Sequence, residues 1–346
     1  MQKRFSQKIE EMRRLIGGSA SVSVSGEGSR GGRKCAAPQT SFSAHRYLLA
    51  VSGGMDSMCM ADLFLKTVGA GHFAIAHCNF SLRGGESDGD EALVRDWAQS
   101  NDVQLFVKRF DTVAYAREKG ISIEMAARDL RYGWFAQLCQ EHGFATLSVA
   151  HNANDNAETL MLNLLRGTGL NGLHGMDMYS DIPVGSFDDG GDYGITNSRQ
   201  HVAVFRPLLE FTRKQVEGYV LTHRVPYRHD SSNFESDYKR NRIRNEVFPI
   251  FEKINPSFIR TLNREIGYFA EAGSIVDDWC RSKMPQILTS PIPEHAGDAL
   301  SVKPDMSVEA KRLDINISAL MATPHWRYLL YTYSSHTAST HRPLPQ

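Results

Sequence analysis

The 346-residue sequence lacks several features that would each point to a particular class of protein. No CxxC pair occurs among its five cysteines, which argues against a zinc site, an iron–sulfur cluster or a disulfide framework and fits reduced thiols in the cytoplasm. No apolar run is long enough to cross a bilayer, so no membrane partner is expected. The formal net charge is zero, so any contact with a polyanion must come from a local patch. The cysteines are Cys35, Cys59, Cys78, Cys139 and Cys280.

Length and changes in composition predict two domains together with additional segments. The first 16 residues mix basic and acidic side chains with spaced apolar ones, which predicts a short helix rather than a signal or transit peptide. Residues 17–44 form a Gly/Ser-rich insert that is expected to be flexible, and 45–225 carry an α/β pattern. We expect a helical domain at 226–290 and an irregular region at 291–346, where the chain is either natively short or truncated.

Short apolar runs alternate with helical periodicity from residue 47 onward. The apolar runs predict strands at 47–51, 72–77, 103–108, 145–150 and 202–205. Helical patterns are found at 88–100, 121–141, 153–165 and 212–223. We therefore expect an α/β fold with a doubly wound, mostly parallel sheet and ligands at the carboxyl ends of its strands. The polar, turn-rich segment 178–200 is expected to be a long surface loop.

Ser52-Gly53-Gly54-Met55-Asp56-Ser57 follows the first strand and opens a helix. Paired glycines let the backbone approach a ligand closely, and N–H groups at a helix start attract anions. Asp56 would repel a phosphate unless a divalent cation lay between them, so the segment predicts a pyrophosphate loop with its own magnesium ligand. It is not the GxxxxGK[ST] P-loop, because no lysine follows the glycines. The alternative is an ordinary turn in which Asp56 or Ser57 caps the helix.

Histidine and arginine side chains lie near the second expected strand and on the long helix that follows the third. His77 ends the second strand and Arg83 follows it, which fits either an adenine pocket or an ordinary loop. Arg128, Arg131 and Tyr132 share one face of the helix. Two arginines facing a phosphate site would stabilise charge that develops during adenylation. The alternative is a solvated face with salt bridges.

A histidine and two carboxylates follow the fourth expected strand. His151 ends that strand, and Asp155 and Glu158 lie at i, i+3 spacing on the first turn of the next helix. These carboxylates would face the sheet edge where a metal-bound pyrophosphate would lie. The alternative is helix capping, with Asn152 or Asn154 as the cap.

A compact cationic segment, Lys-Arg-Asn-Arg-Ile-Arg, occupies residues 239–244. It includes Arg240, Asn241 and Arg244, and Asn233 precedes it. Such a segment suits an RNA backbone and exposed bases. The alternative is a solvated basic helix start.

Together these segments resemble those of the tRNA(Ile)-lysidine synthetase family, which belongs to the PP-loop superfamily of ATP pyrophosphatases. The matching segments are SGGMDS, EMAARDLRY, AHNANDNAETLMLNLLRGTGLNGL, RPLLEFTRKQVEGYV, DSSN and YKRNRIRNEVFP. The resemblance implies an adenine nucleotide alpha-hydrolase-like fold and a ligase that uses ATP and Mg²⁺. By this resemblance, ATP adenylates the C2 carbonyl of the wobble cytidine in tRNA(Ile) with a CAU anticodon. The ε-amino group of L-lysine then displaces AMP and forms lysidine.

The residues and the resemblance together assign an expected role to each candidate. Expected ATP contacts are Ser52, Gly53, Gly54, Met55, Asp56, Ser57 and His77. Expected catalytic residues are Asp56, Arg128 and His151. Expected magnesium ligands are Asp56, Asp155 and Glu158. Expected tRNA contacts are Arg83, Arg131, Asn233, Arg240, Asn241 and Arg244.

This chain departs from the family pattern in two places. The family usually has HHxDD where this chain has amides at Asn152 and Asn154, so one histidine and one carboxylate are replaced. The region after residue 290 has no counterpart of the domain with which many members grip the acceptor stem. The amides favour one alternative, a non-catalytic nucleotide- or tRNA-binding protein. The other alternative, a different PP-loop tRNA-modifying enzyme such as a thiolase, would need paired cysteines. The sequence leaves monomer and homodimer open and does not locate the lysine pocket.

Overall fold

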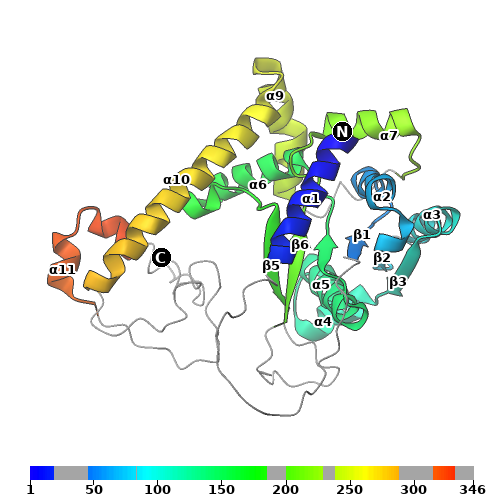
Figure 1. The fold of residues 1–346 in the computed structure, drawn as a ribbon, viewed down its shortest axis with the longest axis horizontal. Coiled ribbons are helices and arrows are strands. Elements are labelled where there is room, and N and C mark those ends of the chain that lie inside the picture. The colour runs from blue at the N-terminus through cyan, green and yellow to red at the C-terminus, as the bar shows by residue number, and fades with distance from the viewer. Residues whose placement is uncertain (19–45, 83, 185–199, 229–237, 288–314, 332–346) are drawn as a thin grey trace, which may run out of the picture. The chain divides into compact units, whose positions relative to one another are not determined.

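The structure is a computed structural model of the chain, and it describes residues 1–18, 46–82, 84–184, 200–228, 238–287 and 315–331 (Figure 1). The insert expected at 17–44 falls almost wholly outside these residues, as do Arg83 and Asn233. Among the described residues, no helix is both long and apolar enough to cross a membrane.

A six-stranded sheet has the strand order β3-β2-β1-β4-β6-β5. Its strands are β1 (Tyr47–Ala50), β2 (Phe73–Asn79), β3 (Gln104–Arg109), β4 (Thr146–Ser148), β5 (Tyr179–Val184) and β6 (Gln200–Phe205). All neighbouring strands pair in parallel except β5 with β6. The predicted doubly wound, mostly parallel sheet is therefore confirmed.

The surface loop predicted at 178–200 is wrong in its first part, because Tyr179–Val184 forms the edge strand β5. The sequence YSDIPV hides this strand, since Asp181 and Pro183 are residue types that strands usually avoid. An edge strand tolerates proline, because one side of the strand needs no partner for its N–H groups.

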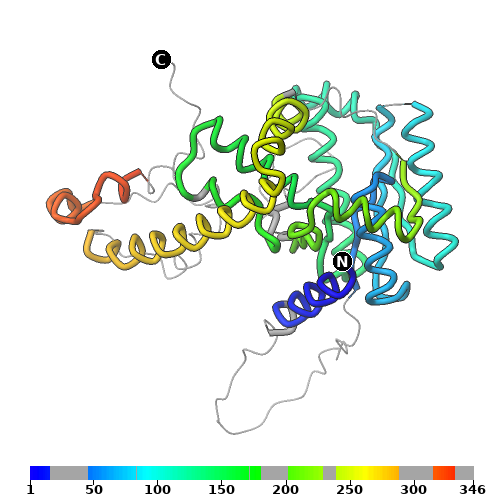
Figure 2. Tube along the Cα trace, turned by 90° about the horizontal axis from the view of Figure 1, so that it is seen from above, coloured from blue at the N-terminus to red at the C-terminus, as the bar shows by residue number. Residues whose placement is uncertain are grey.

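Helices cover both faces of the sheet (Figures 1 and 2). On one face the strands share a core with α1 (Gln2–Gly18), α2 (Met55–Val68), α3 (Gly85–Ser100) and α7 (Arg213–His223). On the other face a second core includes α5 (Ile123–His142), which α4 (Thr112–Lys119) precedes. The helix predicted at the start of the chain is present as α1, and it buries Phe5, Ile9 and Met12. This amphipathic face explains why α1 docks on the sheet.

The order of the strands changes direction between β1 and β4. Along the chain, β1 is followed by β2 on one side of it, whereas β4 lies on its other side. The segments that leave the carboxyl ends of β1 and β4 therefore diverge and leave a crevice between them. Residues 52–57 follow β1, and His151 follows β4, so both lie at this crevice.

Other elements precede residue 258 in the sequence. They are η1 (Ala70–His72), α6 (Ala153–Arg166), η2 (Leu170–Gly172), α8 (Tyr238–Arg242), the π-helical turn η4 (Ile243–Val247) and α9 (Phe248–Ile254). Asn152 caps α6 through a capping box with Asp155, so the predicted asparagine cap is confirmed at this residue.

The chain packs as two compact units, residues 1–167 with 175–265 and residues 168–174 with 266–346. The helix α10 (Phe258–Ile287) begins in the first unit and continues in the second. The second unit also contains α11 (Ile317–Ala322) and has its own small core of Cys280, Ile287, Leu320 and Leu329. Packing divides the chain near residue 265, whereas the sequence predicts a division near residue 225, and the predicted domain limits stay a prediction.

Candidate active site

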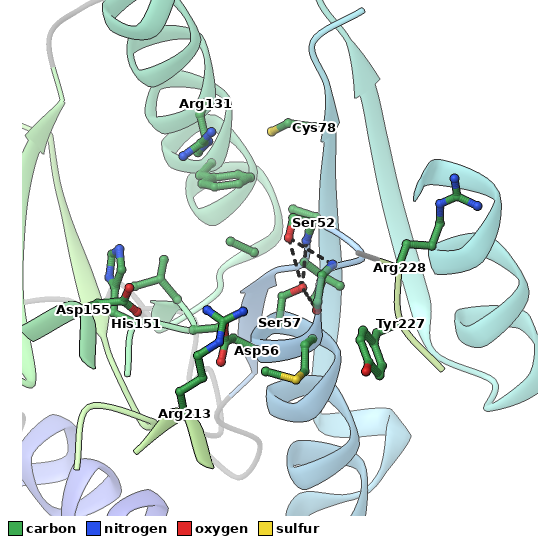
Figure 3. Close-up of a pocket in the computed structure, with 18 of the residues that line it drawn as sticks. Ser52, Asp56, Ser57, Cys78, Arg131, His151, Asp155, Arg213, Tyr227 and Arg228 are labelled. Atoms are coloured by element: carbon green, nitrogen blue, oxygen red, sulfur yellow. Dashed lines mark hydrogen bonds between the residues drawn. The ribbon is translucent and has the colours of Figure 1, made fainter. Parts of the chain in front are cut away.

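A cavity of about 570 Å³ opens at the carboxyl ends of β1, β2 and β4 (Figure 3). This volume is typical of a site for a small molecule. The loop after β1, the end of β2, the segment after β4 and one face of α5 contribute side chains to its wall. The start of α7 and residues 227–228 complete it.

The glycine loop after β1 is held in shape by its own two serines. The hydroxyl of Ser57 donates to the carbonyl of Gly54 at 2.9 Å, and the N–H of Gly54 donates to the hydroxyl of Ser52 at 3.3 Å. Gly53 has a φ of +92°, which a side chain would strain. The cap of α2 is Gly54, with no side-chain hydrogen bond, so neither Asp56 nor Ser57 acts as the cap. The uncapped start of α2 lines the cavity and can accept an anion.

Asp56 and Asp155 are two of the carboxylates that line this cavity, and they interact electrostatically. Asp56 lies on the first turn of α2 and Asp155 on the first turn of α6 (Figure 3). Burial, and then the negative charge of Asp155, raises the pKa of the Asp56 carboxyl above its ordinary value. The amide of Asn152 donates to Oδ1 of Asp56 at 3.0 Å, and the backbone N–H of Asn152 donates to Oδ2 of Asp155 at 2.9 Å. A divalent cation would relieve the repulsion between the two carboxylates.

The donor set fits a magnesium ion that is shared with phosphate. Among the described residues, no three or more His, Cys, Asp or Glu side chains form a cluster that could hold a metal by themselves. Magnesium is usually bound by one or two carboxylates together with water and substrate phosphates, rather than by a complete protein cage. Asp56 and Asp155 beside an anion-binding loop match that arrangement, and Asp155 also pairs with Arg244 through Oδ1 at 3.4 Å, which is longer than the contacts that engage Glu158.

Several residues to which the sequence assigns no role also line the cavity, among them Arg213, Tyr227 and Arg228. The guanidinium of Arg213, at the start of α7, lies beside the carboxylate of Asp56 in Figure 3. Tyr227 and Arg228 lie across from it, where the N–H of Arg228 donates to the carbonyl of Gly53 at 3.0 Å. Threonine followed by arginine at a helix start, in RPLLEFTRK, was the available signal for Arg213. The Arg228 contact joins residues far apart in sequence and left no local signal.

His151 lines the cavity as predicted, and it is electrically neutral at pH 7. Burial, followed by the charges of nearby arginines, lowers the pKa of its imidazole to about 3. Within the described part of the chain its buried Nδ1 has no hydrogen-bond partner. A neutral imidazole with an unused ring nitrogen can donate to, or accept from, a bound substrate.

The predicted arginine face of α5 is only partly directed into the cavity. Arg131 and Tyr132 line it, and Arg131 lies over the ring of Phe80 at 5.1 Å. Arg128 lies instead over the ring of Tyr132 at 5.0 Å and is exposed. Neither arginine forms an ion pair with another described residue, although Arg128 is exposed, as the alternative of a solvated face predicts.

His77 does not line the cavity, which changes its expected role. Side chains alternate along β2, so Ala76 and Cys78 face the cavity while His77 faces the opposite side. Its Nδ1 lies 2.9 Å from the carbonyl oxygen of Val51, the last residue before the glycine loop. Burial lowers the pKa of His77. The structure therefore gives His77 a supporting contact under the loop in place of the predicted contact with ATP.

Glu158 also differs from its predicted role as a magnesium ligand. Its side chain is 1% exposed, and both of its oxygens are engaged by arginines. Arg244 binds it through Nε at 2.7 Å and Nη2 at 2.9 Å, and Arg240 binds it through Nε at 2.9 Å. These ion pairs leave Glu158 without a free oxygen for a metal, and they direct both arginines toward α6. The pairing of Arg240 and Arg244 with Glu158 argues against their predicted contact with tRNA phosphates.

The other predicted residues are placed as follows. Asn154 lies outside the cavity wall, and its Oδ1 accepts the N–H of Arg213 at 3.0 Å, so it supports the start of α7. Asn241 is half-buried on α8. Arg83 and Asn233 lie outside the described residues. The contacts of Asn241, Arg83 and Asn233 with tRNA stay predictions.

Comparison with known proteins relates the chain to tRNA-modifying enzymes. The tRNA(Ile)-lysidine synthase of Porphyromonas gingivalis (strain ATCC BAA-308 / W83) is 44% identical over 63% of this chain and 43% of its own length. That of Chlorobaculum tepidum is 40% identical over 62% of this chain and 60% of its own length. The chain thus spans about half the length of the curated relatives it matches.

A solved structure with a similar fold is the U34-tRNA thiolase NcsA from Methanococcus maripaludis, determined with its [4Fe-4S] cluster. It matches with a TM-score of 0.50 and 16% identity over 65% of this chain and 72% of that chain, which shows the fold alone. The sequence pattern of the PP-loop domain matches residues 29–251, which include the glycine loop, Asp56, Asp155 and every other residue that lines the cavity. A domain of this kind implies the use of ATP. Because the match covers well over half of the residues of this chain, the chain belongs to the PP-loop domain family.

Proposed function

We propose that this protein ligates L-lysine to C2 of the wobble cytidine of tRNA(Ile) with a CAU anticodon, using ATP and forming lysidine. The observation that carries the proposal is the uncapped start of α2, which lies in one cavity with Asp56 and Asp155. The names of the similar tRNA(Ile)-lysidine synthases support this choice of substrate. A cytoplasmic location and either a monomer or a homodimer are consistent with it.

The reaction would take place in two steps that share the cavity. In the first, the C2 carbonyl oxygen of the cytidine attacks the α-phosphorus of ATP, and pyrophosphate leaves. In the second, the ε-amino group of lysine attacks C2, AMP leaves with the oxygen, and the amine loses a proton. The glycine loop, with the hydroxyls of Ser52 and Ser57, would hold the β- and γ-phosphates.

Charged and polar side chains around the loop would handle the developing charge. Asp56 and Asp155 would hold the magnesium ion, which would neutralise the leaving pyrophosphate. Arg131 faces the cavity and would stabilise negative charge on the α-phosphate. His151, which is neutral, would accept a hydrogen bond from the lysine amine or from the cytidine. Arg128 lies behind Tyr132 and would act by orienting that ring.

The tRNA would approach from the side of α8. Lys239 is exposed on this helix, and Arg242 is exposed beside it in a pair with Glu246 at 3.1 Å. These two side chains are better placed for phosphate contacts than Arg240 and Arg244, which pair with Glu158. An exposed basic patch can bind RNA even when the net charge of the protein is zero.

A non-catalytic nucleotide- or tRNA-binding protein is the second candidate, because the amides at Asn152 and Asn154 replace two polar residues of the family pattern. Mass spectrometry of tRNA nucleosides separates the two functions. Unmodified tRNA(Ile) with a CAU anticodon is incubated with protein, ATP, magnesium and lysine, and control reactions omit either ATP or lysine. Lysidine in the complete reaction alone supports the proposal. Its absence, when a known synthase modifies the same tRNA, supports the binding protein.

A further inference from the structure

Asn152 makes hydrogen bonds in two directions from a fully buried position. Asn152 is 1% exposed and lies at the junction of β4 and α6. Oδ1 accepts the backbone N–H groups of Asn154 at 2.8 Å and Asp155 at 3.2 Å, which caps the helix. Nδ2 donates to Oδ1 of Asp56 at 3.0 Å. The two ends of one amide thus join α6 to α2 across the crevice.

The neighbours of Asn152 fix which end of its amide is oxygen and which is nitrogen. Two N–H donors surround one end, and a carboxylate oxygen faces the other. The reverse orientation would set two donors against each other and two acceptors against each other. Only a short side chain that both accepts and donates satisfies this position. Aspartate and serine can also cap a helix, but aspartate would add a third negative charge, and serine is too short to reach Asp56.

The contacts of Asn152 also determine which carboxylate oxygens are available. Its side chain occupies Oδ1 of Asp56, and its backbone N–H occupies Oδ2 of Asp155. Within the described part of the chain, no hydrogen-bond donor contacts Oδ2 of Asp56. Both carboxylates therefore have one oxygen anchored by the same residue. The other oxygen of Asp155 lies 3.4 Å from Nη2 of Arg244, so the remaining oxygen of Asp56 is the one left for a cation.

We propose that Asn152 is a positioning residue that orients Asp56, and with it Asp155, for the divalent cation of the ATP site. The proposal rests on the proposed function only in taking this cavity as the site of magnesium and ATP. It assigns a role to one of the two amides that depart from the family pattern. The amide serves as an outer partner of the metal ligands, and such partners orient a ligand and tune its affinity for the metal.

The test is the binding of Mn²⁺ to the full-length protein in the presence of α,β-methylene-ATP, measured by electron paramagnetic resonance. Asn152→Ser keeps an acceptor for the helix cap but removes the donor to Asp56. We expect it to weaken Mn²⁺ binding by roughly tenfold or more, while the affinity for the nucleotide alone in EDTA stays within about twofold. The same variant should need more magnesium for AMP formation and should recover its rate at saturating magnesium.

Asn154→Ser is the matched control, because it makes the same substitution two residues away, on the first turn of the helix that Asn152 caps. The Asn154 side chain contacts the N–H of Arg213 and does not contact Asp56. Its Mn²⁺ affinity should stay close to that of the wild type. If Asn152→Ser fails to fold, Asn152→Thr, which also keeps a cap and lacks the amide donor, carries the same expectation.

Three results would overturn the proposal. They are wild-type Mn²⁺ affinity in Asn152→Ser, equal losses in Asn152→Ser and Asn154→Ser, and no nucleotide-dependent Mn²⁺ binding by the wild type. None of these measurements requires tRNA. A wild-type protein that binds Mn²⁺ with the nucleotide and loses it in Asn152→Ser, but forms no lysidine, would contradict the proposed function and support the role of Asn152.

Discussion

At the scale of single residues, Asp56 is a carboxylate whose charged form is disfavoured by its surroundings in the cavity. It is largely enclosed, it faces Asp155, and its pKa is raised by burial and by that neighbour. A protein keeps such a group where the charge has a use, since perturbed carboxylates gather at functional sites. The arginines around it compensate only in part, because Arg244 is already bound to Glu158.

We expect Asp56→Asn to stabilise the metal-free protein at neutral pH while abolishing AMP formation. A raised carboxyl pKa means that the folded protein holds this proton more tightly than the unfolded chain does. The free energy of unfolding therefore falls as pH rises from the ordinary pKa of aspartate, about 3.9, through the raised value. Asp56→Asn has no carboxyl group here and does not lose this stability. The difference in free energy of unfolding between the variant and the wild type should therefore increase over that pH range and vanish at lower pH. Urea unfolding in EDTA across this range measures the difference.

Asp96→Asn is a suitable control for this experiment, because Asp96 is an exposed carboxylate on α3 that does not line the cavity. It should change neither the pH profile of stability nor AMP formation. An Asp56→Asn variant that is equally or less stable than the wild type at every pH would contradict the electrostatic account of Asp56. Near-normal pyrophosphate release from it would contradict the assignment of the loop.

At the scale of elements, one buried carboxylate joins α6 to the segment formed by α8 and η4. Glu158 is 1% exposed, and its partners Arg240 and Arg244 lie four residues apart, so that both reach it. The two arginines are more than 80 residues from Glu158 in sequence. This cluster fixes the position of the basic segment that follows residues 229–237.

We expect Glu158→Gln to lower the free energy of unfolding by about 2–4 kcal/mol, because it removes the buried negative charge that two partly buried guanidinium groups share. The matched control is Glu246→Gln, which breaks the exposed pair with Arg242 on the same segment. That change should cost no more than about 0.5 kcal/mol. Urea unfolding followed by tryptophan fluorescence compares the two. Equal small effects would mean that the cluster adds no stability.

The elements also show what the sequence could and could not predict. The strands β1, β2 and β4 lie within the mainly apolar runs that predict strands in the sequence, at 47–51, 72–77 and 145–150. The residues that follow β1 and β4, such as Asp56 and His151, could therefore be placed at one sheet edge from the sequence. The edge strand β5 was missed because its residue types disfavour strands, and it is stabilised by pairing with β6. The contacts that Glu158 and His77 make were not predicted, for a different reason. Ion pairs between distant segments, and the face on which one strand residue points, depend on packing that local patterns do not contain.

At the scale of the whole molecule, a net charge of zero means that tRNA binding must depend on where the basic side chains lie. We expect Lys239→Ala to weaken tRNA binding and to reduce the slope of log affinity against log salt by about one. ATP binding should be unchanged, since Lys239 is not part of the cavity wall. Filter binding at several salt concentrations measures both quantities. Lys3→Ala, an exposed lysine on α1, serves as the control, and an equal effect in both variants would contradict a local RNA surface on α8.

The proposed function requires the loop of residues 52–57 to direct cleavage of ATP between its α- and β-phosphates, which activates a tRNA base. The most direct measurement incubates the protein with ATP labelled at the α-phosphate, magnesium and unmodified tRNA(Ile) with a CAU anticodon, first without lysine. The account predicts that label becomes attached to the tRNA and that unlabelled pyrophosphate is released. Adding lysine should then release the label as AMP. Label recovered only as ADP, or tRNA that never becomes labelled although ATP binds, would contradict the account.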